Sequence, residues 1–422
     1  MTITTMLAAA ASSAFDVDAA TRAYLAMVQG PVRARSDAYF EGGYWLLLWS
    51  TLIGIAVNWA LLHFGWSARW SAWAGRRTRR PWLRTMLYWL PYLLVTSLIL
   101  LPWSIYTDFW REHQYGMSNQ SFAAWMSEQL TSAAISLVVG AVVLAAVYAV
   151  IRRAPRSWWL WGTGLMVAFL TFGALLAPVF VAPLFNTYKP MAEGPLRTEI
   201  LAMAKANNVP ADNVYVFDAS KQTDRISANV SGIGPTVRIS LNDNLLNRTS
   251  PEEVKAVMGH ELGHYVLNHV VKLIGSFALV FLAVFLFAWF LAPRLLARFG
   301  QRWGVRDVVS TASLPLLSIL FSLGIFLATP FTKSIVRVNE VEADAFGLDA
   351  ARKPDGFAHV AMRLSEYRKL EPGKLEEVVL FDHPSGYNRA RMAMDWKARH
   401  LAELPPEDRA LKRPAPLPDK QP

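Results

Sequence analysis

The chain has 422 residues, of which 53% are hydrophobic, and it contains 17 tryptophans and no cysteine. This composition excludes an ordinary soluble globular protein and a disulfide-stapled fold, and it favours a protein with several membrane spans. The net charge of +10 lies largely in short loops between apolar segments, so it indicates lipid headgroups as partners rather than nucleic acid. Without cysteine, any metal site must be built from His, Asp and Glu.

Several segments of about 20 mainly apolar residues are long enough to cross the hydrocarbon core of a bilayer. They lie at roughly 43–64, 83–105, 130–151, 158–181, 272–293 and 311–331. Trp and Tyr crowd their ends, where an amphipathic ring prefers the headgroup level. The sequence therefore predicts a multi-pass integral membrane protein with six spans.

Two stretches outside the spans have mixed polarity. In the first, "LRTEILAMAKANN" has the apolar spacing of a helix, whereas "NVYVFD" and "TVRISLN" alternate like short strands. Two crossings return the chain to the side it left, so both stretches lie on one side of the membrane. The predicted boundaries are 1–42 (N-terminal extramembrane segment), 43–181 (four spans), 182–270 (extramembrane domain, first part), 271–331 (two spans), 332–402 (second part) and 403–422 (disordered, proline-rich tail).

The segment "NRTSPEEVKAVMGHELGHYVLNHVVK" predicts a helix, since Ser250 suits the N-cap and Pro251 the first turn. On such a helix His260 and His264 are one turn apart and face the same way, so two imidazoles can reach one Zn²⁺. Glu261 lies beside them and can take a proton from an activated water. The alternative is a chance H-E-x-x-H, but such copies often fall where no helix can form.

Zinc needs a third protein ligand and an open position. In "VNEVEADAFGLDA" Glu340 and Asp344 lie four residues apart on a predicted helix, so both can face one site, whereas Glu342 points elsewhere. We expect Glu340 to be the third ligand and Asp344 to accept from a ligand histidine's remaining N–H. A solvated acidic helix face is the alternative for this cluster taken alone.

Taken together, the H-E-L-G-H helix, "EVEAD" and "VAPLFNTYKPMAEGPLRTEI" resemble the integral-membrane zinc metallopeptidases typified by type I CAAX prenyl endopeptidases. The resemblance covers nearly the whole chain. It implies that Glu261 is the catalytic base, that His260, His264 and Glu340 bind zinc, and that Asp344 supports a ligand.

The same resemblance extends to "FDHPSGYNRARM" near the C-terminus. It implies that His383 and Arg389 line the site and help to hold substrate or the developing oxyanion. For His383 alone, a surface-loop histidine is the alternative. Asn229, in "ISANVSGIGP", is a candidate substrate-backbone binder, although this stretch departs from the S-N-A-Y-like start usual in the family.

The expected fold is that of a mainly α membrane protein. About six transmembrane helices would form a barrel or chamber, capped by a small α+β zincin-like metalloprotease domain that the last two spans split. In this plan the ligand helix continues into the fifth span, and "TVRISLN" (236–242) is the edge strand on which an extended peptide pairs.

The basic loops 65–82, 152–157 and 294–310 predict one membrane face, because short loops rich in Lys and Arg stay in the cytoplasm. Counting crossings places both extramembrane stretches on the other face. We therefore expect a protein of a bacterial inner membrane whose site opens to the periplasm. Arginines that line a chamber would produce the same charge pattern.

The sequence thus predicts a membrane-embedded zinc metalloendopeptidase that acts on peptide or protein substrates, lipidated or membrane-inserted. The alternatives are a quality-control protease that does not require prenylation and a non-catalytic membrane scaffold. A structural zinc site has no use for a base such as Glu261 and commonly has four protein ligands, which argues against the scaffold.

Overall fold

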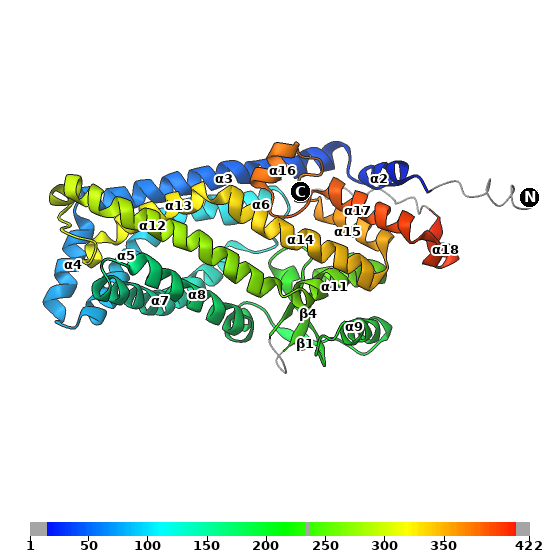
Figure 1. The fold of residues 1–422 in the computed structure, drawn as a ribbon, viewed down its shortest axis with the longest axis horizontal. Helices are drawn as coiled ribbons and strands as arrows, with labels where there is room; N and C mark the ends of the chain where they lie inside the picture. The colour runs from blue at the N-terminus through cyan, green and yellow to red at the C-terminus, as the bar shows by residue number, and fades with distance from the viewer. Residues whose placement is uncertain (1–14, 233–236, 411–422) are drawn as a thin grey trace, which may run out of the picture.

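The structure is a computed structural model that describes residues 15–232 and 237–410. Long helices lie side by side in an elongated bundle, and the sheet gathers with shorter helices at one end of it (Figure 1). The fold is therefore a helical membrane protein with a small α+β domain at one end, as the sequence predicts.

Five helices in the described residues are long and apolar enough to cross a membrane. They are α3 (Gly30–His63), α5 with its extension through η1 and α6 (Pro81–Gln114), α7 (Phe122–Arg153), α8 with its extension (Trp158–Leu184) and α12 (His269–Trp303). Taken together, two further consecutive segments are also long and apolar enough: η6 with α13 (Thr311–Leu327) and α14 (Thr329–Ala351), which are bent by 54° and count as a sixth span when taken as one. The bend lets the chain leave the bundle and enter the domain that holds the site.

Buried tyrosines and serines join the helices at the end of the bundle opposite the sheet. Ser67 lies on α4 (Trp66–Arg77), and its hydroxyl is 2.6 Å from the Tyr88 hydroxyl of α5. Tyr148 of α7 contacts the Ser313 hydroxyl at 2.9 Å. Interhelical hydrogen bonds of this kind hold helices together where lipid supplies no hydrophobic driving force.

The three basic loops meet at this same end. The Ser67 hydroxyl donates to the carbonyl of Ala312, which follows loop 294–310, and Arg152 at the end of α7 donates to Thr85 at the start of α5. The sheet lies at the other end (Figure 1). The loops therefore share one face, as predicted.

The sheet has four short strands in the order β1-β2-β4-β3. They are β1 (Tyr188–Pro190), β2 (Val214–Phe217), β3 (Ala228–Ser231) and β4 (Arg238–Asn242). The prediction that 236–242 is an edge strand is wrong, because β4 pairs in parallel with β2 and antiparallel with β3. The edge beside helix α11 (Pro251–Val266) belongs to β3, whose weak apolar pattern did not predict a strand.

Helices complete the extramembrane domain. They are α9 (Pro195–Ala206), α10 (Asp243–Arg248), α11 (Pro251–Val266), α15 (Pro354–Leu364), α16 (Lys374–Leu380) and α17 (Gly386–Arg399), together with α2 (Val17–Leu25) and α18 (Pro406–Arg409). One apolar core joins α11 to the sheet through Met258, Leu262 and Ile239, all fully buried. A second core packs α2 against α15 and α17.

The predicted disordered tail, 403–422, is wrong for its first part. Leu404 is buried in the core of α2, α15 and α17, and Arg409 donates to its carbonyl. Lys397 donates both to Asp355 and to the carbonyl of Ala410. A buried ammonium group needs such partners, which hold this segment in place although its composition is typical of a tail. Residues 411–422 lie outside the described residues.

The ligand helix does not run unbroken into the fifth span, which corrects the expected continuity. Helix α11 ends at Val266, and α12 begins at His269. Between them Asn268 adopts a left-handed conformation with φ of 55°, which an α-helix cannot contain and which Asn tolerates well. The break turns His269 back towards the site.

Candidate metal centre

Helix α11 begins as the sequence predicts. The Ser250 side chain accepts from the backbone N–H of Glu253, and the Glu253 carboxylate accepts from the backbone N–H of Ser250 at 2.7 Å. This capping box satisfies two N–H groups that the helix cannot pair itself. Glu253 is also held by Arg363 of α15, so the start of the ligand helix is fixed to its neighbour.

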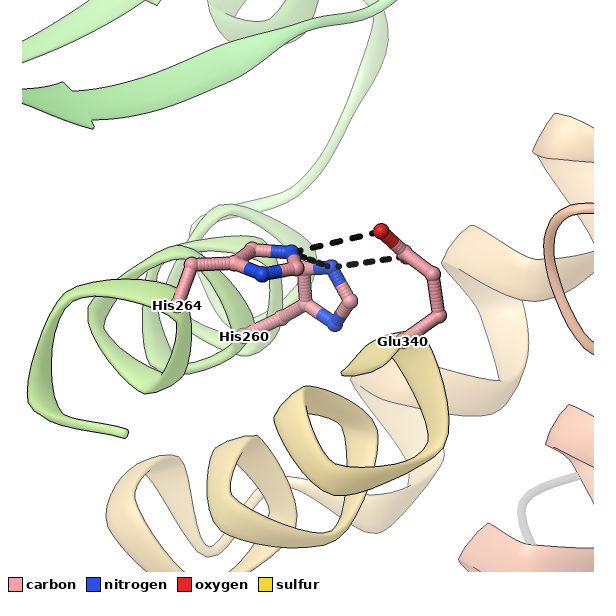
Figure 2. Close-up of side chains that lie close together, drawn as sticks. All are labelled: His260, His264 and Glu340. Carbon is pink, nitrogen blue, oxygen red and sulfur yellow. Dashed lines mark hydrogen bonds and ion pairs between the residues drawn. The ribbon is translucent and has the colours of Figure 1, made fainter. Parts of the chain in front are cut away.

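Three side chains from two helices point at one another (Figure 2). The Nε2 atoms of His260 and His264 on α11 are 3.1 Å apart. Each of them lies 3.4 Å from a carboxylate oxygen of Glu340 on α14. Among the described residues this is the group of His, Asp and Glu whose donor atoms converge closely enough to hold a metal ion.

These separations fit a tetrahedral metal ion. With ligand bonds of about 2.0–2.2 Å, a tetrahedral ion holds neighbouring ligand atoms roughly 3.3–3.6 Å apart. The two observed distances of 3.4 Å lie within this range, and the distance of 3.1 Å lies just below it. Two imidazoles and one carboxylate are also a donor set of catalytic zinc sites, in which a fourth position stays open for water.

Close contact between two helices brings the donors together. A side-chain carbon added at Gly347 on α14 would lie 2.7 Å from the backbone nitrogen of His260, and one added at Gly259 on α11 would lie 2.7 Å from the Gly347 carbonyl. Only glycine permits this approach, which sets how far Glu340 stands from the histidines.

Asp344 and Arg389 hold His260 and Glu340 in place through polar contacts. His260 Nδ1 is 2.7 Å from Asp344 Oδ1, within ion-pair distance, so the carboxylate favours a proton on Nδ1 and leaves Nε2 free for a metal. Arg389 of α17 donates from Nε to Asp344 and from Nη2 to Glu340. Arg389 therefore lies at the site, as expected, but these two donors hold acidic residues.

His269 supports the second histidine, a role that the sequence did not predict. His264 Nδ1 is 2.8 Å from His269 Nδ1, and His269 Nε2 is 3.1 Å from Glu342, which Lys272 also contacts. Glu342 points away from the metal position, as predicted, yet it is connected to it through two rings. The spacing of residues along a helix does not predict the contact between His264 and His269, because this contact depends on the break at Asn268.

Glu261 lines a cavity of about 230 Å³ together with His260 and Glu340. No hydrogen bond or ion pair joins its carboxylate to another residue in the described part of the chain. Burial raises the pKa of Glu261 to about 7. A carboxylate that is free of partners and has a pKa near neutrality is suited to accept and return a proton.

The two histidines differ in proton affinity. Burial alone would lower the pKa of His260, but contact with Asp344 outweighs it and raises that pKa to about 10. Burial and the neighbouring His260 lower the pKa of His264 to about 4. Coordination requires neutral imidazole, so metal and proton compete for His260.

The two remaining predicted site residues, His383 and Asn229, differ in whether they line the cavity. His383 lines the cavity, with Nε2 3.2 Å from Glu340 and Nδ1 2.7 Å from Asp382. It is therefore not a distant surface histidine. Asn229 lies on β3 opposite Ser240, and its neighbour Ala228, rather than Asn229, lines the cavity. Among the described residues, Asn229 is therefore outside the cavity lining, and its role stays a prediction.

Comparison with known proteins agrees with this geometry. The family described as "CAAX prenyl protease N-terminal, five membrane helices" matches residues 31–187, and "Peptidase family M48" matches residues 190–397. The matches define the class, with which a His-His-Glu trio at the end of a helical membrane bundle agrees: the chain is an integral-membrane metalloprotease that hydrolyses peptide bonds. It belongs to peptidase family M48.

Individual relatives cover much of the chain. An uncharacterized metalloprotease of Bacillus subtilis is 30% identical over 81% of this chain and 81% of its own length. A human CAAX prenyl protease 1 homolog is 27% identical over 72% of this chain and 71% of its own. The crystal structure of Ste24p from S. mikatae has the same fold, with a TM-score of 0.74, 19% identity and coverage of 90% of this chain and 96% of that one.

Proposed function

We propose that the protein is a zinc metalloendopeptidase in which His260, His264 and Glu340 hold the ion and Glu261 is the general base. The observation that carries the proposal is the set of separations of 3.1–3.4 Å between three donors from two helices. When bound, zinc would polarise the scissile carbonyl and make water acidic enough to lose a proton near neutral pH.

Side chains of the protein would carry out proton transfer, position the ligands and stabilise the oxyanion. Glu261 takes a proton from the attacking water and later gives it to the leaving amine. Asp344 keeps His260 in the orientation that presents Nε2. His383, whose ring lines the same cavity, is the candidate for stabilising the developing oxyanion. Arg389 positions Asp344 and Glu340.

The peptide has a place to bind at the edge of the sheet. Ile226, Ser227 and Ala228, at the start of edge strand β3, line the cavity that contains Glu261. An extended peptide that pairs with β3 would present its backbone to the metal with little choice of sequence.

The Glu261→Gln variant tests the mechanism. The variant should retain zinc and lose at least about a hundredfold in turnover, since general-base catalysis contributes roughly 10²–10⁴-fold. Glu193→Gln is a matched control, because Glu193 has a side chain that is 94% exposed and lies outside the site. Equal turnover in wild type and Glu261→Gln would reject the role of base.

The proposed function allows two substrate classes, prenylated peptides and unmodified polypeptides. Relatives named CAAX prenyl protease suggest a prenylated peptide. A cavity of about 930 Å³ next to the site is lined both by apolar side chains, such as Leu46, Leu47 and Phe185, and by charged ones, such as Asp108, Glu112 and Arg225. Its lining therefore suits an unmodified polypeptide, as in a quality-control role, as well as a lipid-modified one. Cleavage of a farnesylated peptide and its unmodified twin, measured side by side, separates the two.

We further propose that the site faces the periplasm of a bacterial inner membrane. The basic ends of the helices meet at the face opposite the sheet, and the positive-inside rule places such a face in the cytoplasm.

A further inference from the structure

Arg368 lies in the segment after α15, at the boundary between two cavities. One is the cavity of about 230 Å³ at the metal centre, and the other is the larger cavity of about 930 Å³. Tyr367 and Arg368 line both of them. A polypeptide that extends from the larger cavity to the metal centre therefore passes the Arg368 side chain.

The Arg368 guanidinium forms no hydrogen bond or ion pair within the described part of the chain. Its Nη1 atom is fully enclosed and has no hydrogen-bond partner, and burial lowers the pKa of the group. Its central carbon is 6.0 Å from the Tyr367 ring, at the outer limit of a cation–π contact. Asp382 and Glu340 attract it only over a longer range.

Other cations around the two cavities are paired. Each of them has a carboxylate close by, in the pairs Arg111 with Glu112, Arg225 with Glu112, Lys333 with Asp382 and Arg389 with Asp344. Arg368 differs from all four because no carboxylate of the described residues lies within ion-pair distance of its guanidinium. Its segment is held by other groups: the Ser36 hydroxyl donates to the carbonyls of Ser365 and Arg368, and Lys369 pairs with Glu41 and Glu376. The guanidinium is thus left available at a fixed place.

An enclosed cation without a counter-ion costs free energy, and an arriving anion removes that cost. The planar guanidinium matches a carboxylate with two parallel hydrogen bonds. The metal-centre cavity is smaller than the roughly 300–1,000 Å³ of drug-sized ligand pockets, so it takes a short peptide segment. A carboxylate near the scissile bond is the substrate group that pairs with this cation and that the small cavity can hold.

We propose that Arg368 binds a carboxylate of the peptide substrate and thereby determines specificity. The inference rests on the proposed peptidase function, which supplies the peptide. Two sources offer the same chemistry: the free α-carboxylate at the end of a peptide, and an Asp or Glu side chain close to the scissile bond.

The test uses one fluorescent peptide in three forms: with a free C-terminal acid, with a C-terminal amide, and with an amide after an added terminal Glu. Binding is measured on the full-length Glu261→Gln protein, where no turnover interferes. The free acid should bind about tenfold to a hundredfold more tightly than the amide, as expected for a charge-assisted hydrogen bond. The form with the added Glu shows whether a side-chain carboxylate substitutes.

Adding Arg368→Gln should abolish the preference and leave amide binding unchanged. Arg368→Lys should keep part of the preference, because an ammonium cannot form the paired hydrogen bonds, and it answers the question if the Gln variant does not fold. Arg399→Gln, at an exposed position on α17, is the matched control and should keep the full preference.

Equal binding of the acid, the amide and the Glu form, no binding of any form, or a preference that survives Arg368→Gln would overturn the inference. Cleavage by the otherwise wild-type protein separates the two proposals. A preference that depends on Arg368 without any cleavage sinks the peptidase mechanism alone, whereas cleavage that depends on Glu261 without a preference sinks only the role of Arg368.

Discussion

Gly347→Ala tests whether the close approach of α11 and α14 builds the metal centre. The added carbon would lie 2.7 Å from the His260 nitrogen and 2.9 Å from its Cα, whereas ordinary contact begins at 3.4 Å. Backbone atoms of a helix cannot rotate away as a side chain can. The two helices must therefore separate by about 0.7 Å at this point, which moves Glu340 away from both imidazoles.

The expected loss can be estimated. Overpacking of this kind costs about 1–3 kcal/mol of stability, and disturbed support of metal ligands weakens affinity by roughly 10–100-fold. Zinc affinity measured by competition with a chelator, together with thermal unfolding of the detergent-solubilised protein, gives both quantities. Gly275→Ala on α12 is the control, since nothing lies within 4 Å of its added carbon.

Zinc affinity and turnover in Gly347→Ala that match those of Gly275→Ala would refute the reasoning. Such a result would mean that the spacing of the two helices does not set the distance between the donors.

Three further outcomes follow from the contacts around the site. His269→Ala should lower zinc affinity by roughly 10–100-fold, because His264 loses the group that orients its ring; chelator competition measures this, and an unchanged affinity contradicts it. Asp344→Asn should weaken zinc binding to a similar extent, since the amide lacks the charge that holds His260 and Arg389, and elemental analysis after dialysis checks it. A C-terminal fusion should show alkaline phosphatase activity rather than the fluorescence of a cytoplasmic-only reporter.

Local patterns predicted the helix of the two candidate metal ligands and the membrane spans. His260 and His264 stand one turn apart, and this spacing fixes their shared face once the helix forms, which the capping residues Ser250 and Glu253 promote. Apolar length likewise predicted the membrane helices, because a span must be apolar over its whole length. In both cases the structure is determined by residues that lie close together in the sequence.

Contacts between distant segments were less predictable. Neither Arg368 nor His269 lies in a pattern that reveals its neighbours, since one follows a helix in a loop and the other depends on the turn at Asn268. Strand β4 reads as an ordinary half-buried strand, and only its pairing with both β2 and β3 shows that it is central. The ordered part of the tail depends on Lys397, which joins the Ala410 carbonyl to Asp355, a residue 42 positions earlier in the sequence.

The order of strands and the break between α11 and α12 have a functional consequence. With β4 in the middle, the edge strand beside Glu261 in the described part of the chain is β3, and the proposed substrate strand would pair there. With the break at Asn268, the fifth span is attached to the ligand helix through a turn. His269 at the start of the fifth span contacts both His264 and Glu342, so this span is joined to the candidate metal centre through His269.

The most direct test of the account is the zinc content of the purified protein and of Glu340→Ala, measured by elemental analysis without chelators. The account predicts about one zinc per chain in the wild type and a large loss in the variant, because three protein ligands drop to two. A wild type without metal, or a Glu340→Ala variant with its full zinc content, would contradict it.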